Sequence, residues 1–106
     1  MEAPFIHLAE IKLAPGVSEA ELLAASDAFE RNFVSKQEGV LRRILLKGPG
    51  GSYADLVFYR SREDADRLMQ NEEANLHCQS YFSVMQLPED DPEAGVTSFE
   101  TLRTYG

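Results

Sequence analysis

Two histidines are the side chains of this 106-residue chain best suited to moving a proton at neutral pH. His7 falls in a segment that predicts a strand, and His77 falls on a run of apolar residues at helical spacing. Imidazole titrates near working pH, so either histidine is a candidate base toward a bound ligand. The alternatives are structural: a His7 that pairs with a strand neighbour, and a His77 at the edge of the core or at a subunit contact.

Asp55 is the third catalytic candidate, because it lies between Tyr53 and Tyr59 in a predicted strand. A carboxylate among aromatic rings can have a raised pKa and act as a base. The alternative is an ion pair with Arg42 or Arg43, which lie on the other strand of the same predicted hairpin.

Tyrosines are the candidate ligand-binding residues. A tyrosine offers an apolar ring and a hydroxyl that can donate a hydrogen bond to a ligand oxygen. The three candidates are Tyr53, Tyr59 and Tyr81, and packing between subunits is the alternative role for each. In the catalytic interpretation His7 or His77 is the base, and Asp55 and Tyr81 orient the substrate.

Metal and nucleophilic chemistry are not predicted. Cys78 adjoins His77, but adjacent helical residues point about 100° apart and cannot hold one metal ion. The sequence has no H-x-x-x-H or C-x-x-C pair. The apolar neighbourhood of Cys78 indicates burial, which disfavours a reactive thiol. The Gly48-Pro49-Gly50-Gly51 run leads into a strand, so it predicts a turn and not a phosphate-binding loop.

The elements that must position these residues follow from periodicity and turn signals. Ser18 and Glu21 form a predicted capping box for the first helix, and Ser61 is the predicted cap of the second. The second helix carries a long apolar stripe, with a predicted kink or break at Asn71-Glu72-Glu73. The predicted strands are residues 5–13, 40–47, 53–60 and 96–105, with the glycine turn joining the middle two.

This βαββαβ order predicts an α+β fold, a four-stranded antiparallel sheet with both helices on one face. We expect Ala54, Leu56 and Phe58 to face the helices. The uncovered face should then carry the residues that alternate with them, together with matching positions of the first strand: Tyr53, Val57, Tyr59, Phe5, Ala9 and Ile11. A soluble monomer rarely leaves such a patch exposed, which predicts a homodimer that packs sheet against sheet.

Composition limits the class of protein. The length and the 43% hydrophobic content predict one domain spanning residues 1–106. The net charge of −8 disfavours binding to nucleic acid or to anionic membranes. No run of 18 apolar residues and no signal peptide are evident, and one cysteine suits a reducing compartment, so we expect a cytoplasmic protein.

Several segments resemble the antibiotic biosynthesis monooxygenase-like family of the dimeric α/β-barrel superfamily. They are the Ile6-His7-Leu8-Ala9-Glu10-Ile11-Lys12-Leu13 strand running into Pro15-Gly16-Val17, the Gly39-Val40 strand start, Leu56-Val57-Phe58-Tyr59-Arg60-Ser61, Ala65 and the segment from His77 to Phe82. The resemblance covers nearly the whole chain. It implies a ferredoxin-like protomer and a homodimeric barrel.

The resemblance also implies a range of activities. The family includes cofactor-free oxygenases of phenols, quinol oxygenases, haem-degrading enzymes and proteins without known activity. This chain has no tryptophan where the haem degraders use one, near Leu68, and it has Ala9 in place of their strand asparagine. We therefore expect no haem and no other cofactor.

Two functions follow. The first is a cofactor-independent monooxygenase acting on a small phenolic or quinol substrate, in which the deprotonated substrate itself reduces oxygen. The second is a non-catalytic dimeric module that binds a small aromatic ligand or a protein. An isomerase or lyase in the same barrel is a third possibility. The sequence does not decide between enzyme and module.

Overall fold

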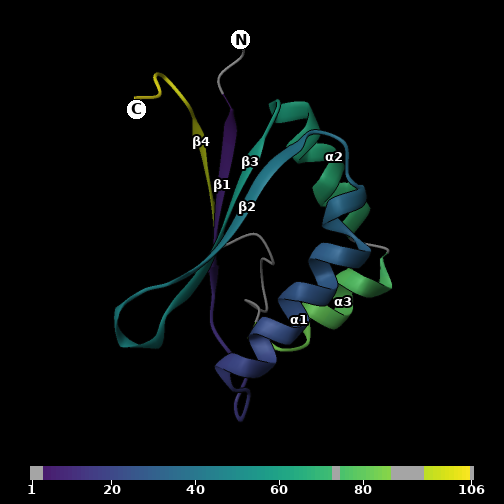
Figure 1. The fold of residues 1–106 in the computed structure, drawn as a ribbon, viewed down its shortest axis with the longest axis vertical. Helices are drawn as coiled ribbons and strands as arrows, with labels where there is room; N and C mark the ends of the chain where they lie inside the picture. The colour runs from purple at the N-terminus through teal and green to yellow at the C-terminus, as the bar shows by residue number, and fades with distance from the viewer. Residues whose placement is uncertain (1–3, 73–74, 87–94, 106) are drawn as a thin grey trace.

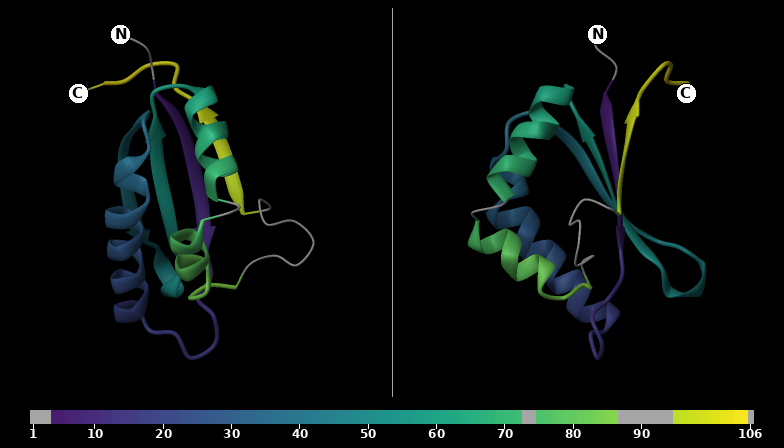
Figure 2. Two further views of the ribbon diagram at one scale, coloured as in Figure 1. Left: turned by 90° about the vertical axis from the view of Figure 1, so that its right-hand side faces the viewer. Right: turned by 180° about the vertical axis from the view of Figure 1, so that it is seen from behind.

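A four-stranded antiparallel sheet forms one layer of the molecule, and the helices form the other (Figures 1 and 2). The structure is a computed structural model that describes residues 4–72, 75–86 and 95–105. The strands are β1 (Phe5–Ile11), β2 (Val40–Lys47), β3 (Tyr53–Tyr59) and β4 (Val96–Glu100), in the order β2-β3-β1-β4. The helices are α1 (Glu19–Asn32), α2 (Arg62–Glu72) and α3 (Leu76–Phe82), with short 3-10 turns η1 (Val34–Lys36) and η2 (Pro49–Gly51). The predicted α+β ferredoxin-like fold is confirmed.

Both predicted helix starts are confirmed. Ahead of α1, the Glu21 amide donates to Ser18 Oγ at 3.2 Å, and the Ser18 amide donates to Glu21 Oε1 at 3.3 Å. Ahead of α2, the Asp64 amide donates to Ser61 Oγ at 3.2 Å. These bonds satisfy amides that have no partner within the helix itself.

The predicted break in the second helix is also confirmed, and it changes where His77 lies. Helix α2 ends at Glu72, and α3 begins at Leu76 with its own cap, because Asn75 Oδ1 accepts from the His77 amide at 2.8 Å. The new helix docks through Cys78 and Tyr81, which are buried. His77 is exposed, so its predicted place on the buried stripe is wrong.

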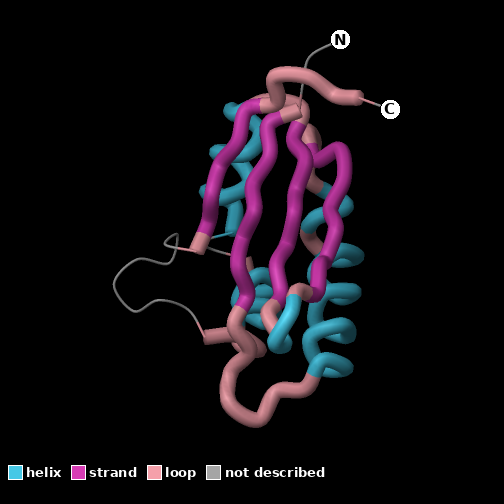
Figure 3. Tube along the Cα trace, turned by 90° about the vertical axis from the view of Figure 1, so that its left-hand side faces the viewer, coloured by secondary structure: helices cyan, strands magenta, loops and turns pink. Residues whose placement is uncertain are grey.

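The helices cover the opposite face of the sheet from the one predicted. Tyr59 and Ile11 are buried in the core beneath the helices, and Tyr53, Val57 and Phe5 pack against that core. Strand alternation decides which residues share a face, but it does not decide which face the helices cover. Figure 3 views the sheet from its open face. The apolar residues that the strand register places on this face are Ile6, Leu8, Ile44, Leu46, Ala54, Leu56, Phe58 and Phe99.

A β-bulge at Leu41 changes the face of the sheet on which Val40 lies. Val40 pairs with Tyr59 and Arg42 pairs with Phe58, so Leu41 is left over and is 60% exposed. The extra residue reverses the alternation, so Val40 packs toward the helices while Arg42 points to the open face. Val40 therefore lies on the opposite face from Ile44, although simple alternation along the strand would place the two on one face.

Strand β4 is shorter than predicted. It ends at Glu100, which pairs with Phe5, the first residue of β1. Beyond that pair β1 offers no further partner, so residues 101–105 are not a strand, and Leu102 is 91% exposed. The glycine turn is confirmed, with positive φ at Gly50 and Gly51.

Candidate functional site

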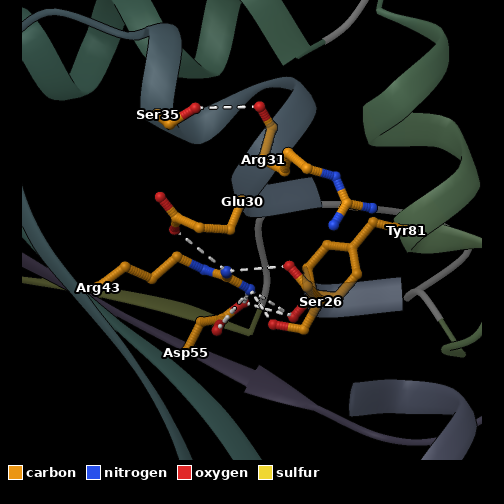
Figure 4. Close-up of polar contacts among 7 residues, drawn as sticks. All are labelled: Ser26, Glu30, Arg31, Ser35, Arg43, Asp55 and Tyr81. Atoms are coloured by element: carbon orange, nitrogen blue, oxygen red, sulfur yellow. Dashed lines mark hydrogen bonds and ion pairs between the residues drawn. The ribbon is translucent and has the colours of Figure 1, made fainter. Parts of the chain in front are cut away.

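Asp55 and Arg43 form a buried ion pair between the sheet and the helices (Figure 4). Arg43 Nη2 lies 3.1 Å from Asp55 Oδ1 and donates to Oδ2 at 3.2 Å. The Arg43 side chain is 7% exposed and Asp55 is 7% exposed. Of the two predicted arginine partners, the structure selects Arg43, because Arg43 pairs with Val57 on the face of Asp55, whereas Arg42 pairs with Phe58 on the open face.

Two hydroxyls and two aromatic rings complete the surroundings of this pair. Tyr81 donates to Asp55 Oδ2 at 2.7 Å, and Arg43 Nη2 donates to Tyr81 OH at 3.0 Å and to Ser26 Oγ at 2.9 Å. The guanidinium also lies over the rings of Phe29 and Tyr81, at 5.1 and 5.3 Å from their centroids. The cluster of Arg43, Asp55, Tyr81 and Ser26 thus joins β2, β3, α3 and α1.

The cluster keeps two of its groups, Arg43 and Tyr81, protonated. Burial, followed by the charge of Asp55, raises the pKa of the Tyr81 phenol. Burial lowers the pKa of Arg43, but Asp55 and Tyr81 outweigh it, so the net shift is upward. Arg43 therefore stays cationic and Tyr81 stays a hydrogen-bond donor at neutral pH. Because hydrogen bonds and an ion pair link these groups, the arrangement is suited to clamping the helices to the sheet, although Arg43 Nε and Asp55 Oδ1 are buried without a hydrogen bond.

A small pocket lies between α1 and α3. Its volume is about 70 Å³, and its walls include His77, Tyr81 and Phe29. This pocket brings two of the predicted site residues together and reaches the cluster through the Tyr81 ring. A cavity of about 150 Å³ holds benzene, so this smaller space does not suit a phenolic ring.

A larger pocket of about 340 Å³ lies between α2 and the strands β1 and β4, and we call it the His7 pocket. His7 is 7% exposed and lines it. The imidazole makes edge contacts with Phe5 and Tyr59, at ring-centroid separations of 5.4 and 5.1 Å. The remaining lining residues are Arg62, Asp66, Met69, Val96, Ser98 and Glu100.

Ser98 is the polar neighbour of His7 on the sheet. The two residues are directly opposite in the antiparallel β1–β4 ladder, and both line the pocket. Side chains at such positions leave the same face with their Cβ atoms about 4.5–5.5 Å apart. A ligand hydroxyl at this point therefore meets an imidazole and a serine hydroxyl together.

The six predicted site residues divide into three places. Asp55, Tyr81 and His77 lie around α3, whereas His7 and Tyr59 lie beside the larger pocket, with Tyr59 packed against the imidazole and absent from the lining. Tyr53 lies apart from both and donates to Glu19 Oε1 at 3.0 Å. His7, Asp55 and His77 do not share one cavity.

Sequence reasoning did not single out several residues of these sites. Ser26 belongs to no recognisable sequence motif, although it accepts a hydrogen bond from Arg43. Ser98 becomes a neighbour of His7 only through the β1–β4 register. Arg62, Asp66 and Glu100 become neighbours only where α2 packs beside β1 and β4. Arg43, by contrast, was anticipated as an alternative partner of Asp55.

Within residues 4–72, 75–86 and 95–105, no three His, Cys, Asp or Glu side chains are grouped as a metal site requires. Burial, followed by the charge of Glu72, raises the pKa of the Cys78 thiol to about 12, so it stays protonated. In the same residues no helix is both long enough and apolar enough to cross a bilayer.

Solved structures share this fold. A point mutant of SnoaB, a cofactor-independent oxygenase from Streptomyces nogalater, matches with a TM-score of 0.73 at 13% identity over 96% of each chain. Rv0793 from Mycobacterium tuberculosis matches with a TM-score of 0.68 at 20% identity, over 98% of this chain and 100% of that one. A candidate antibiotic biosynthesis monooxygenase from Bordetella bronchiseptica matches with a TM-score of 0.72 at 13% identity, over 98% and 100%.

These likenesses show that the chain has the fold of the antibiotic biosynthesis monooxygenase-like proteins. No protein-family model matches the sequence, and no curated protein is significantly similar to it.

Proposed function

We propose that this protein is a cofactor-independent monooxygenase that oxidises a small phenolic or quinol substrate in the His7 pocket. The observation that carries the proposal is a largely buried imidazole in the wall of a pocket of about 340 Å³. The pocket exceeds the space that a benzene ring needs. The fold shared with SnoaB supports the same chemistry.

In the proposed reaction His7 takes the proton of the substrate hydroxyl, and Ser98 donates a hydrogen bond to the oxygen that becomes negative. The phenolate passes electrons to dioxygen, and a carbon–peroxide bond forms on the ring. The O–O bond then breaks, one oxygen stays as a ring carbonyl, and the other leaves as water with two hydrogens of the substrate. A phenol and dioxygen thus give a quinone and water.

The test is oxygen uptake with a panel of phenols and quinols, measured for the wild type and for His7→Gln and His77→Ala. We expect a fall of about 10²–10⁴-fold in His7→Gln, the range that general-base catalysis contributes. His77→Ala should keep its turnover, since His77 lies at the small pocket. Unchanged turnover in His7→Gln would show that His7 is not the base. Loss of turnover in His77→Ala alone would assign the base to His77.

We also propose that the protein is a homodimer, with the open sheet face as the interface. Large apolar side chains on this face remain accessible in the single chain, including Phe99 at 47% and Leu46 at 38%. Light scattering should give twice the chain mass. Phe58→Glu on this face should give the monomer mass, whereas Leu23→Glu, on α1 and 49% exposed, should leave the dimer intact.

A non-catalytic binding module is the second candidate function. The observation that favours it is that Asp55 Oδ2 accepts hydrogen bonds from both Arg43 and Tyr81, which holds this candidate base on groups of the protein. A binding module of this kind should bind phenols in the His7 pocket without oxygen uptake. His7→Gln should then change only the affinity for phenols. Oxygen consumption dependent on His7 would exclude it.

A further inference from the structure

We propose that the His7 pocket selects a ring substrate that carries a protonated amine. The proposal deepens the proposed function and rests on it, since it takes the same pocket as the substrate site.

Carboxylates line the pocket from two different elements. Asp66 comes from α2 and Glu100 comes from β4, and Arg62 is the one arginine or lysine among the lining residues. Two negative charges therefore face one positive charge at neutral pH. The net charge of −8 on the whole chain has the same sign and favours a cation over an anion at this site.

An aromatic ring lies beside one of these carboxylates. Phe5 and Glu100 are directly opposite in the β1–β4 ladder, and both line the pocket. An ammonium group at this end is attracted by the carboxylate and by the face of the phenyl ring, since cations are drawn to the ring quadrupole.

The spacing along the sheet matches a ring with polar groups at both ends. The Phe5–Glu100 pair lies two residues along the ladder from the His7–Ser98 pair, which is about 7 Å at the rise of a strand. A phenol whose amine is carried opposite its hydroxyl spans this distance. Its hydroxyl meets His7 and Ser98 when its amine lies beside Glu100, and Met69 and Val96 supply apolar wall.

The positive charge of Arg62 opposes the preference of the pocket for a cation. It lies one turn before Asp66 on α2 and lines the same pocket. Neutralising Arg62 should therefore strengthen cation binding, whereas neutralising either carboxylate should weaken it.

The experiment compares three phenols of similar size: tyramine, which is cationic, tyrosol, which is neutral, and para-hydroxyphenylacetate, which is anionic. Their affinities for the wild-type protein are measured by NMR titration, following the backbone amides of His7 and Ser98. We expect tyramine to bind about threefold or more tightly than tyrosol, and para-hydroxyphenylacetate to bind most weakly, as exposed ion pairs allow. Equal affinity for tyramine and tyrosol would overturn the proposal.

Charge-neutral variants separate a local effect from the general charge of the chain. Asp66→Asn and Glu100→Gln should each weaken tyramine binding about two- to fivefold and leave tyrosol unchanged. Arg62→Gln should strengthen tyramine binding by a similar factor. The matched control is Glu63→Gln, which removes the same charge from an exposed residue of α2 outside the pocket lining. An effect of Glu63→Gln equal to that of Asp66→Asn would contradict the proposal.

The binding measurement tests the charge preference, and the oxygen-uptake measurement tests the oxygenase, so the two proposals can fail independently. Selective binding of tyramine without any oxygen uptake would support the charge preference and overturn the oxygenase. Oxidation of tyrosol and tyramine with equal affinities would support the oxygenase and overturn the charge preference.

Discussion

The hydroxyl of Tyr81 lies 2.7 Å from Oδ2 of Asp55 and joins α3 to the centre of the sheet. Tyr81 is 2% exposed, and its ring stacks on Phe29 at 4.4 Å between centroids. One tyrosine therefore contacts the sheet through its hydroxyl and α1 through its ring. This contact holds in place the short helix that carries His77.

Tyr81→Phe should destabilise the protein by about 1.5–3 kcal/mol, because it removes a buried hydrogen bond to a charged acceptor. The measurement is urea unfolding, followed by far-UV circular dichroism. Tyr53→Phe is the matched control, since the Tyr53 hydroxyl also donates to a carboxylate, Glu19, but at an exposed site. We expect the control to stay within about 0.5 kcal/mol of wild type. Equal losses in the two variants would show that burial does not strengthen the Tyr81 contact.

Arg43→Met should cost about 3–5 kcal/mol, because it leaves Asp55 as a buried carboxylate without its cation. The double variant Arg43→Met/Asp55→Leu should recover much of this loss, since apolar residues of similar volume can replace a buried pair. Unfolding free energies of the wild type, the two single variants and the double variant give the coupling energy. Additive losses would mean that the two side chains do not act as a pair.

Gly39→Ala should be more harmful than Gly50→Ala. Both glycines have positive φ, 91° and 71°, and an alanine there costs about 1–2 kcal/mol in backbone strain. A Cβ at Gly39 would also overlap the carboxyl group of Asp64, whereas a Cβ at Gly50 meets no atom within 4 Å. We expect the midpoint of thermal unfolding to fall further for Gly39→Ala. Equal shifts would mean that Asp64 moves aside at little cost.

Asp64 should make stability fall in acid. Hydrogen bonding from Arg60 is the largest contribution that lowers its pKa from 3.8, with further lowering from Ser61 and the charge of Arg67. The folded state therefore binds the proton less readily than the unfolded state. This stabilisation is fully present above the unfolded pKa and is lost as pH falls through the lower folded pKa.

The check is the unfolding free energy from pH 6 down to pH 2, for the wild type and for Asp64→Asn. Asparagine does not titrate, so the variant should lose less stability than the wild type on acidification below about pH 4. Parallel curves would remove Asp64 as a source of the acid dependence.

Local signals in the sequence determined the element order, the capped helix starts, the glycine turn and the break after Glu72, because each depends on residues a few positions apart. Alternation also showed which side chains of β3 share a face. For this reason Asp55 and Tyr59 were correctly predicted to lie on the same face of the sheet.

Only the tertiary structure decided which face the helices cover. Both faces of the sheet are largely apolar, so hydrophobicity alone does not separate them, and the helices pack on the face where Asp55 gains Arg43, Tyr81 and a set of aromatic rings. The β2–β3 register decided that Arg43 and not Arg42 is the partner. The neighbours of His7 depend on β1–β4 pairing across about ninety residues of chain, and exposure of His77 depends on how α3 docks. Contacts of that sequence separation are set by the packing of whole elements, which no local pattern encodes.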